Sequence, residues 1–265
     1  MLTTTSKDGT RIAYEKNGSG PALILVDGAL CYRSFGPMEH LSKLLAPHFT
    51  VIHYDRRGRG DSTNSKPYAV EREVEDIEAL INEAGGSAYV FGTSSGAILS
   101  LEAALRLGGK IKKLALYEPP YNSDAGARLR FRVYKDDVIK AVEENRPGDA
   151  VAEFMQYVGT PQEQVNGMRN SPVWPMMEAI GHTLAYDAEV MGLDGSVPVD
   201  RVGQLSVPTL VMDGGASYEA MPFMRATATA LAETIPGARH RTLEGQTHDV
   251  NLEVLAPVLI EFFEE

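Results

Sequence analysis

A serine stands between two glycines in the segment Gly92-Thr93-Ser94-Ser95-Gly96. The segment follows a short apolar run, 88–91, and opens a mostly apolar stretch with helical character, 96–107. A serine on a sharp strand-to-helix turn has its hydroxyl lifted to the carboxyl edge of a sheet, and flanking glycines leave room for that close approach. The start of the helix favours negative charge that develops nearby. We therefore predict Ser94 as a nucleophile. Ser95 has the wrong register, and the structural alternative is a glycine-rich turn that holds an ordinary serine.

A serine nucleophile needs a general base, and His248 is the first candidate. It lies in the segment 244–249, just after the last strand-like run, 240–243, so its loop should reach the same edge of the sheet. His182 is the competitor, but it belongs to a helical stretch, where a histidine more often faces solvent or substrate. The alternative for His248 is a solvated loop residue.

Strand-like and helical patterns alternate along most of the chain and define what must position these groups. Strands are predicted at 10–15, 22–26, 49–54, 88–91, 111–117, 207–212 and 240–243, and helices at 70–81, 96–107, 222–235 and 252–263. This alternation is typical of an α/β fold with a mostly parallel central sheet and helices on both faces. Between 119 and 206 we find no clear strand, and 149–158 and 175–184 have helical character. We predict one α/β core, 1–118 and 207–265, interrupted by a helical cap, 119–206.

The composition argues against several classes of binding partner, among them nucleic acids and membranes. The 265 residues are 43% hydrophobic and 23% charged, which are globular values. The net charge of −11 argues against binding to nucleic acid or to an anionic membrane surface. The sequence has no stretch long enough for a membrane span, no signal-peptide core at its N-terminus and a single cysteine, Cys31, so we expect a cytoplasmic protein. It has no chelating motif, and no metal or other cofactor is expected.

Together these features resemble the α/β-hydrolase family over nearly the whole chain. The resemblance rests on the segment 92–96, on the late His248, and on Asp55-Arg-Arg-Gly-Arg-Gly-Asp-Ser62, which is similar to the family's Asp-x-x-Gly-x-Gly-x-Ser loop after the fourth strand. We expect a structural role for that loop, with its arginines mostly solvated. The resemblance implies that the insert 119–206 is a lid over the site. It also implies an oxyanion hole formed by the backbone N–H groups of Ala29 and Ser95.

The chain departs from the family's pattern after its third strand. Asp27 precedes Gly28 where the family often has histidine. The backbone donors can survive this change, but an ionised Asp27 would oppose an oxyanion unless it is turned away or protonated. Asp27 could instead bind substrate, and the structural alternative is a loop carboxylate that caps local N–H groups.

The second departure concerns the acid that would orient the histidine. After the strand at 207–212, Ser217 stands where the family usually places aspartate. Glu118 directly follows the strand at 111–117, from which some members, dehalogenases among them, take their acid, and it keeps the order nucleophile, acid, histidine. Glu118 is therefore the first candidate and Asp213 the second, with Glu219 or the absence of an acid still open.

These residues predict a cofactor-free, carboxylesterase-like serine hydrolase that acts on an ester, lactone or thioester carbonyl, with a small apolar acyl compound as substrate. Candidates for the substrate pocket are Asp27, Trp174, His182 and Tyr186, and packing within the cap is the alternative for the residues of the insert. A lyase, epimerase or perhydrolase on the same fold remains open, as does a catalytically silent ligand-binding protein. The oligomeric state is also open, and a homodimer is one candidate.

Overall fold

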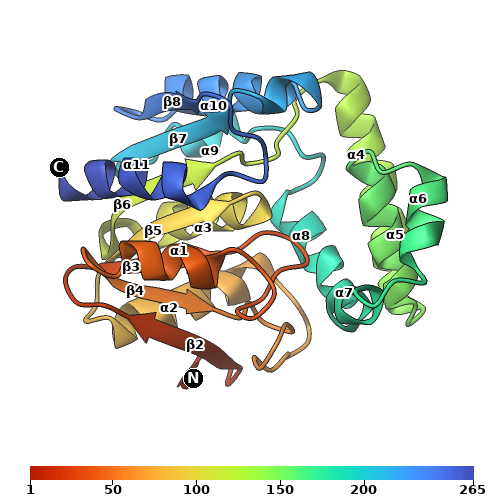
Figure 1. Ribbon diagram of the computed structural model, residues 1–265, viewed down its shortest axis with the longest axis horizontal. Coiled ribbons are helices and arrows are strands. Elements are labelled where there is room, and N and C mark those ends of the chain that lie inside the picture. Colours follow the sequence, from red (N-terminus) through yellow and green to blue (C-terminus); the bar gives the residue numbers. More distant parts are fainter.

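The computed structural model describes residues 1–265 as an eight-stranded sheet with helices on both faces (Figure 1). The strands are β1 (Leu2–Thr5), β2 (Arg11–Asn17), β3 (Ala22–Val26), β4 (Thr50–Tyr54), β5 (Ala88–Thr93), β6 (Ile111–Tyr117), β7 (Thr209–Gly214) and β8 (Arg239–Leu243). Their spatial order is β1-β2-β4-β3-β5-β6-β7-β8. β2 pairs antiparallel with β1 and with β4, and all other neighbours are parallel. The mostly parallel sheet predicted from the sequence is thus confirmed.

Two helical layers cover the sheet, one on each face. Successive residues of a strand point to opposite faces, so an apolar strand has apolar side chains to bury on both sides. In β3, Leu23 and Leu25 face the cluster that includes α1 (Met38–Leu45) and α11 (Leu252–Glu264). Ile24 and Val26 face the cluster that includes α2 (Val70–Glu83), α3 (Ser95–Leu107) and α10 (Phe223–Thr234). All four side chains are fully buried. A strand buried on both faces reads as a continuous apolar run, which is the pattern of 22–26 in the sequence.

Six α-helices lie between β6 and β7. They are α4 (Ala125–Glu143), α5 (Pro147–Tyr157), α6 (Gln162–Met168), α7 (Trp174–Ile180), α8 (Leu184–Val190) and α9 (Val199–Val202). Figure 1 shows α4 to α7 standing to one side of the sheet, with α8 between them and the core. We call α4 to α8 the cap helices. Short 3-10 turns complete the chain at η1 (Gly108–Lys110), η2 (Gly181–Thr183) and η3 (Ser217–Glu219).

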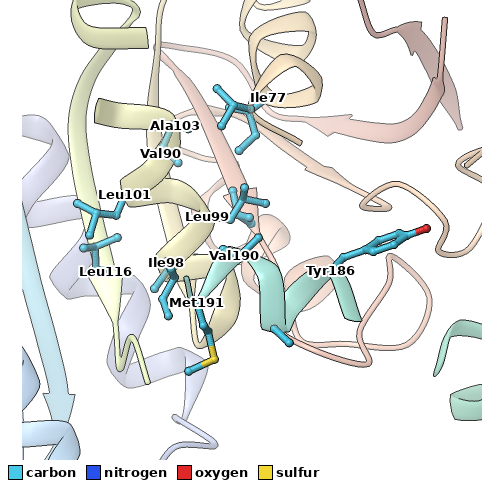
Figure 2. Close-up of a cluster of buried hydrophobic side chains, with 14 of the residues drawn as sticks. Ile77, Val90, Ile98, Leu99, Leu101, Ala103, Leu116, Tyr186, Val190 and Met191 are labelled. Atoms are coloured by element: carbon cyan, nitrogen blue, oxygen red, sulfur yellow. The ribbon is translucent and has the colours of Figure 1, made fainter. Parts of the chain in front are cut away.

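The cap is anchored to the core through α8, which packs against α2 and α3. Figure 2 shows Val190 and Met191, at the end of α8, beside Ile98 and Leu99 of α3. All four belong to one buried hydrophobic cluster. No helix in the structure is both long enough and apolar enough to span a membrane.

Several elements escaped sequence analysis, among them β1, α1, α4 and the short helices α6, α8 and α9. β1 is polar because it is an edge strand that pairs only with β2, so it lacks the apolar run of the central strands. Helix α1 is short and buries one face only, on Met38, Leu41, Ser42 and Leu45. In α4 the buried residues are separated by a dense series of charges, and the sequence pattern shows mainly the exposed face.

Candidate active site

Ser94 lies on the turn between β5 and α3 with a positive φ of 54° and a ψ of −130°. Such a conformation is strained for a residue with a side chain and persists only where the surroundings enforce it. The glycines enforce it here through close backbone contact. A Cβ on Gly96 would lie 2.4 Å from the carbonyl oxygens of Val26 and Asp27, and one on Gly92 would lie 2.4 Å from the carbonyl oxygen of Gly96. The turn that presents Ser94 therefore requires both glycines.

The backbone after β3 lies directly against this serine. A Cβ on Gly28 would lie 3.1 Å from Cβ and 3.6 Å from Oγ of Ser94. The next N–H group, that of Ala29, has no hydrogen-bond partner within the protein. Ser95 is the first residue of α3, where the N–H group has no acceptor within the helix. Two backbone donors without intrahelical or loop partners thus flank the Ser94 side chain.

His248 is held by Glu118. The carboxylate Oε2 of Glu118 lies 2.7 Å from Nδ1 of His248, and its Oε1 accepts a 2.7 Å hydrogen bond from the N–H of Gly214. Glu118 is fully buried, and the Tyr117 hydroxyl donates to the Thr247 carbonyl oxygen at 2.5 Å, which ties down the histidine loop. Because a carboxylate only accepts, a neutral imidazole at this position carries its hydrogen on Nδ1 and its lone pair on Nε2. His248 and Ser94 line the same cavity.

The other acidic candidates have no contact with His248. The buried carboxylate of Asp213 is bonded to His240 at 2.5 Å, Thr242 at 2.9 Å and Arg225 at 3.2 Å. Glu219 is exposed on η3. Ser217 is buried, and its hydroxyl has no hydrogen-bond partner. Of the carboxylates left open by the sequence, Glu118 alone contacts the histidine.

A cavity of about 670 Å³ opens above these groups, between the edge of the sheet and the cap. Most of its wall is apolar. From the core come Met38, Leu41, Phe91, Leu252 and Leu255, from the cap Ala127, Tyr134, Phe154, Tyr157, Ala188 and Met191, and from the loop after η3 and the start of α10 Met221, Phe223 and Met224. The charged residues of the wall are Asp27, Arg130, Asp187 and Asp249.

Asp27 is buried at the wall of this cavity, and its Oδ1 accepts a 2.9 Å hydrogen bond from the N–H of Gly28. Burial raises the pKa of Asp27 to about 6, against the effects of the Gly28 N–H and of the charges of Arg59 and Arg56. This carboxyl group therefore caps its own loop as well as lining the cavity.

The arginines of the segment 55–62 are buried, contrary to the expectation that they are solvated. Arg56, Arg57 and Arg59 are at most 1% exposed. Arg56 pairs with Glu73 and Asp187, Arg57 with Asp76 and Asp8, and Arg59 with Asp187. Most of these carboxylates come from α2 and α8, far along the chain, and buried charges persist where they are paired and hydrogen-bonded.

Three of the four predicted pocket residues lie outside the cavity wall, and only Asp27 is on it. The ring of Tyr186 stacks on Tyr68 with centroids 3.9 Å apart. His182 lies edge-on against Tyr186, and Trp174 is buried in the cap with Arg169 over its ring. Sequence reasoning missed Asp187, the residue after Tyr186, because nothing in its local pattern marks it as facing the core.

The chain is similar to known proteins over most of its length. The chain is 52% identical to a crystal structure of an α/β hydrolase from Sphaerobacter thermophilus over 99% of this chain and 100% of that one, with a TM-score of 0.86. A thermophilic esterase from Thermogutta terrifontis has the same fold at 23% identity, with a TM-score of 0.72 over 99% of this chain and 97% of the esterase. The uncharacterized hydrolase YraK of Bacillus subtilis is 33% identical over 120 residues, which span 44% of each protein. The model of the alpha/beta hydrolase family matches residues 18–258, and the chain therefore belongs to that family.

Proposed function

We propose that this protein is a serine hydrolase that cleaves an ester, lactone or thioester through an acyl-enzyme on Ser94. The observation that carries the proposal is the 2.7 Å contact between Glu118 and Nδ1 of His248, a histidine that lines the same cavity as Ser94. This contact supports a histidine with its hydrogen on Nδ1, so that Nε2 can act as the base for Ser94, which lies on a strained turn. A nucleophile, a base and a group that orients the base are the parts that this chemistry requires.

In the first half of the reaction, Oγ of Ser94 attacks the carbonyl carbon while Nε2 of His248 accepts the hydroxyl proton. The carbonyl π electrons move to oxygen, and the N–H groups of Ala29 and Ser95 donate to this oxyanion. The tetrahedral intermediate then collapses, the bond to the leaving group breaks, and the imidazolium of His248 protonates the departing oxygen or sulfur. Glu118 stabilises the imidazolium throughout.

In the second half, water attacks the acyl-enzyme. Nε2 of His248 takes a proton from the water, the same two N–H groups hold the second oxyanion, and Ser94 leaves with the proton that His248 returns. The products are a carboxylic acid and an alcohol or thiol. Each step uses side chains and backbone groups of this chain alone.

The cavity supports a small to medium apolar acyl substrate. Its volume of about 670 Å³ lies in the range of sites for small organic molecules, and its wall is mainly aliphatic and aromatic. Asp27, Asp187 and Asp249 lie on the wall, and Arg130 is its single arginine or lysine. This balance favours a neutral ester over an anionic one.

A fluorophosphonate probe, followed by mass spectrometry of the adduct, tests the proposal. We expect one adduct, on Ser94, which is lost in Ser94→Ala and forms more slowly in His248→Ala. Ser217→Ala, which changes a buried serine outside the cavity wall, should label like the wild type. A panel of p-nitrophenyl esters then measures turnover. Folded protein that takes up no probe and cleaves no ester would contradict the proposal, and labelling without turnover would indicate a non-hydrolytic reaction.

A further inference from the structure

A single carboxylate of the cap, that of Asp187 in α8, reaches into the core beside the nucleophile. Its Oδ1 accepts hydrogen bonds from the hydroxyl of Ser95 and from Nη1 of Arg56, both at 2.7 Å. Its Oδ2 accepts a 2.7 Å bond from Nη2 of Arg59. All four residues are buried. The group is thus fully bonded on both oxygens, and it connects α8 to two different core segments.

Arg59 links Asp187 to the backbone of the loop after β3. Its Nη1 donates to the carbonyl oxygen of Gly28 at 2.5 Å, and its Nε donates to Oγ1 of Thr183 at 3.1 Å. The Gly28 carbonyl and the Ala29 N–H belong to one peptide unit. That unit is planar and trans, so the N–H points opposite to the C=O. Holding the oxygen of Gly28 therefore fixes the direction of the Ala29 N–H.

Ser95 is held by the same carboxylate. Its Oγ bonds to Asp187, while its N–H, at the first position of α3, is the other donor beside the Ser94 side chain. First-turn residues lack the full set of intrahelical bonds, so a side-chain tether restrains a position that otherwise frays. Asp187 thus restrains both proposed oxyanion donors, one directly and one through Arg59.

The groups around Asp187 favour the charged form of its carboxyl group. Burial alone would raise the pKa of Asp187, but the charges of Arg59 and Arg56 and the hydroxyl of Ser95 hold that pKa below its ordinary value. Arg56 is further fixed by two 2.8 Å bonds to Glu73. Paired guanidinium groups are planar and directional, which suits them to holding a peptide at a set angle.

We propose that Asp187 and Arg59 are positioning residues that orient the two oxyanion donors, so that cap helix α8 takes part in stabilising the transition state. This inference rests on the proposed serine-hydrolase function. Loss of a whole oxyanion donor lowers turnover by about 10² to 10³. Misorientation of a donor that is still present should have a smaller effect, roughly 10- to 100-fold.

The test compares Arg59→Met and Arg59→Lys with Arg57→Met as the matched control. Arg57 belongs to the same loop and is equally buried, but it pairs with Asp76 and Asp8 and makes no hydrogen bond to Asp187 or Gly28. For each folded variant we measure kcat and KM on a p-nitrophenyl ester, and the Ki of a trifluoromethyl ketone. The ketone acquires an oxyanion only after the serine adds to it, so its affinity reports the oxyanion hole without any turnover.

We expect Arg59→Met to lower kcat roughly 10- to 100-fold, to change KM less than about 3-fold, and to weaken the ketone by a factor similar to the loss in kcat. Arg59→Lys, which keeps one donor, should fall between Arg59→Met and the wild type. Arg57→Met should lower thermal stability while kcat and Ki stay within about twofold. Ser95→Ala deletes one oxygen and keeps the backbone N–H, and we expect a loss of roughly 3- to 10-fold in kcat.

Three results would overturn the inference: a folded Arg59→Met variant with kcat within twofold of the wild type, an equal kcat loss in Arg57→Met, or an unchanged Ki with a reduced kcat. If Arg59→Met does not fold, Ser95→Ala decides, and full activity there overturns the inference. A wild-type protein that neither cleaves esters nor binds the ketone refutes the proposed function and the inference with it. An active wild type with fully active variants refutes the inference alone.

Discussion

Replacing Glu118 by glutamine tests the acid of the proposed triad. The two side chains have the same shape, so the Oε1 position can still accept the N–H of Gly214, now 2.7 Å away. The amide nitrogen then takes the place of Oε2 and donates a hydrogen bond to Nδ1 of His248. The imidazole must carry its hydrogen on Nε2 instead. This tautomer has no lone pair directed at the serine, so it cannot accept the Ser94 proton.

The size of the effect follows from this change of tautomer. The equivalent Asp→Asn substitution in a serine protease lowers kcat by about 10⁴ with the geometry intact. Here no second carboxylate contacts His248, since Asp213 is bonded to His240, Thr242 and Arg225. We therefore expect a loss of about 10³ to 10⁴ in kcat, which corresponds to roughly 4 to 5.5 kcal/mol of transition-state stabilisation. KM should change little, because Glu118 does not line the cavity.

Pre-steady-state measurement of p-nitrophenol release separates acylation from deacylation, and we expect both steps to be slower in Glu118→Gln. Asp213→Asn is the matched control, because Asp213 is also a fully buried carboxylate bonded to a histidine. Circular dichroism and thermal unfolding establish that both variants are folded. The assignment fails if Glu118→Gln keeps more than a tenth of the turnover, or if Asp213→Asn loses as much activity as Glu118→Gln.

Three further substitutions probe the surroundings of Ser94. Gly28→Ala places a Cβ 3.1 Å from Cβ of Ser94, and we expect kcat on esters to fall roughly 10-fold or more. Unchanged turnover would show that the loop after β3 can move to accommodate the methyl group. Asp27→Asn removes a carboxyl group whose pKa burial raises to about 6 from 3.8. Because the folded state holds that proton more tightly than the unfolded chain, wild-type stability should fall by roughly 3 kcal/mol between about pH 4 and pH 6. In urea unfolding this part of the fall should be missing from Asp27→Asn, and identical pH profiles would refute the shift. Ala127→Phe fills part of the cavity wall, so kcat/KM should drop more for octanoate than for acetate esters; parallel losses would place the acyl chain elsewhere.

The turn at Ser94 and the sheet that carries it could be predicted from the sequence, because their signals are local. Glycine spacing and apolar runs fix the strand, turn and helix at 88–107 within a residue or two of their positions in the structure. The carboxyl ends of parallel strands meet at one edge, so a residue just after 111–117 and a loop just after 240–243 can meet there. The contact between Glu118 and His248 depends on nothing more distant than this topology.

The surroundings of the site could not be predicted, because they depend on partners far apart in the chain. Three arginines in eight residues look like a solvated loop until the carboxylates of α2 and α8 are placed against them. The cavity wall also depends on how segments from different parts of the chain are placed against one another. Tyr186 and Asp187 are neighbours in sequence, yet Tyr186 stacks on Tyr68 away from the cavity, whereas Asp187 turns toward Ser95. Only the rotation of α8 about its axis decides which of the two faces the nucleophile.

Directional polar contacts add to apolar packing in setting that rotation. The contacts of Val190 and Met191 with α3 are non-directional, and a buried aliphatic surface of this kind tolerates small sliding or turning of one helix on another. Buried ion pairs contribute little net stability, but each bond of Asp187 to Arg56, Arg59 and Ser95 has a defined length and direction. The same carboxylate therefore fixes α8, and with it the cavity wall at Ala188 and Met191, in register with the backbone donors at Ser94. A cap held in this way would couple the shape of the cavity to the geometry of the proposed oxyanion hole.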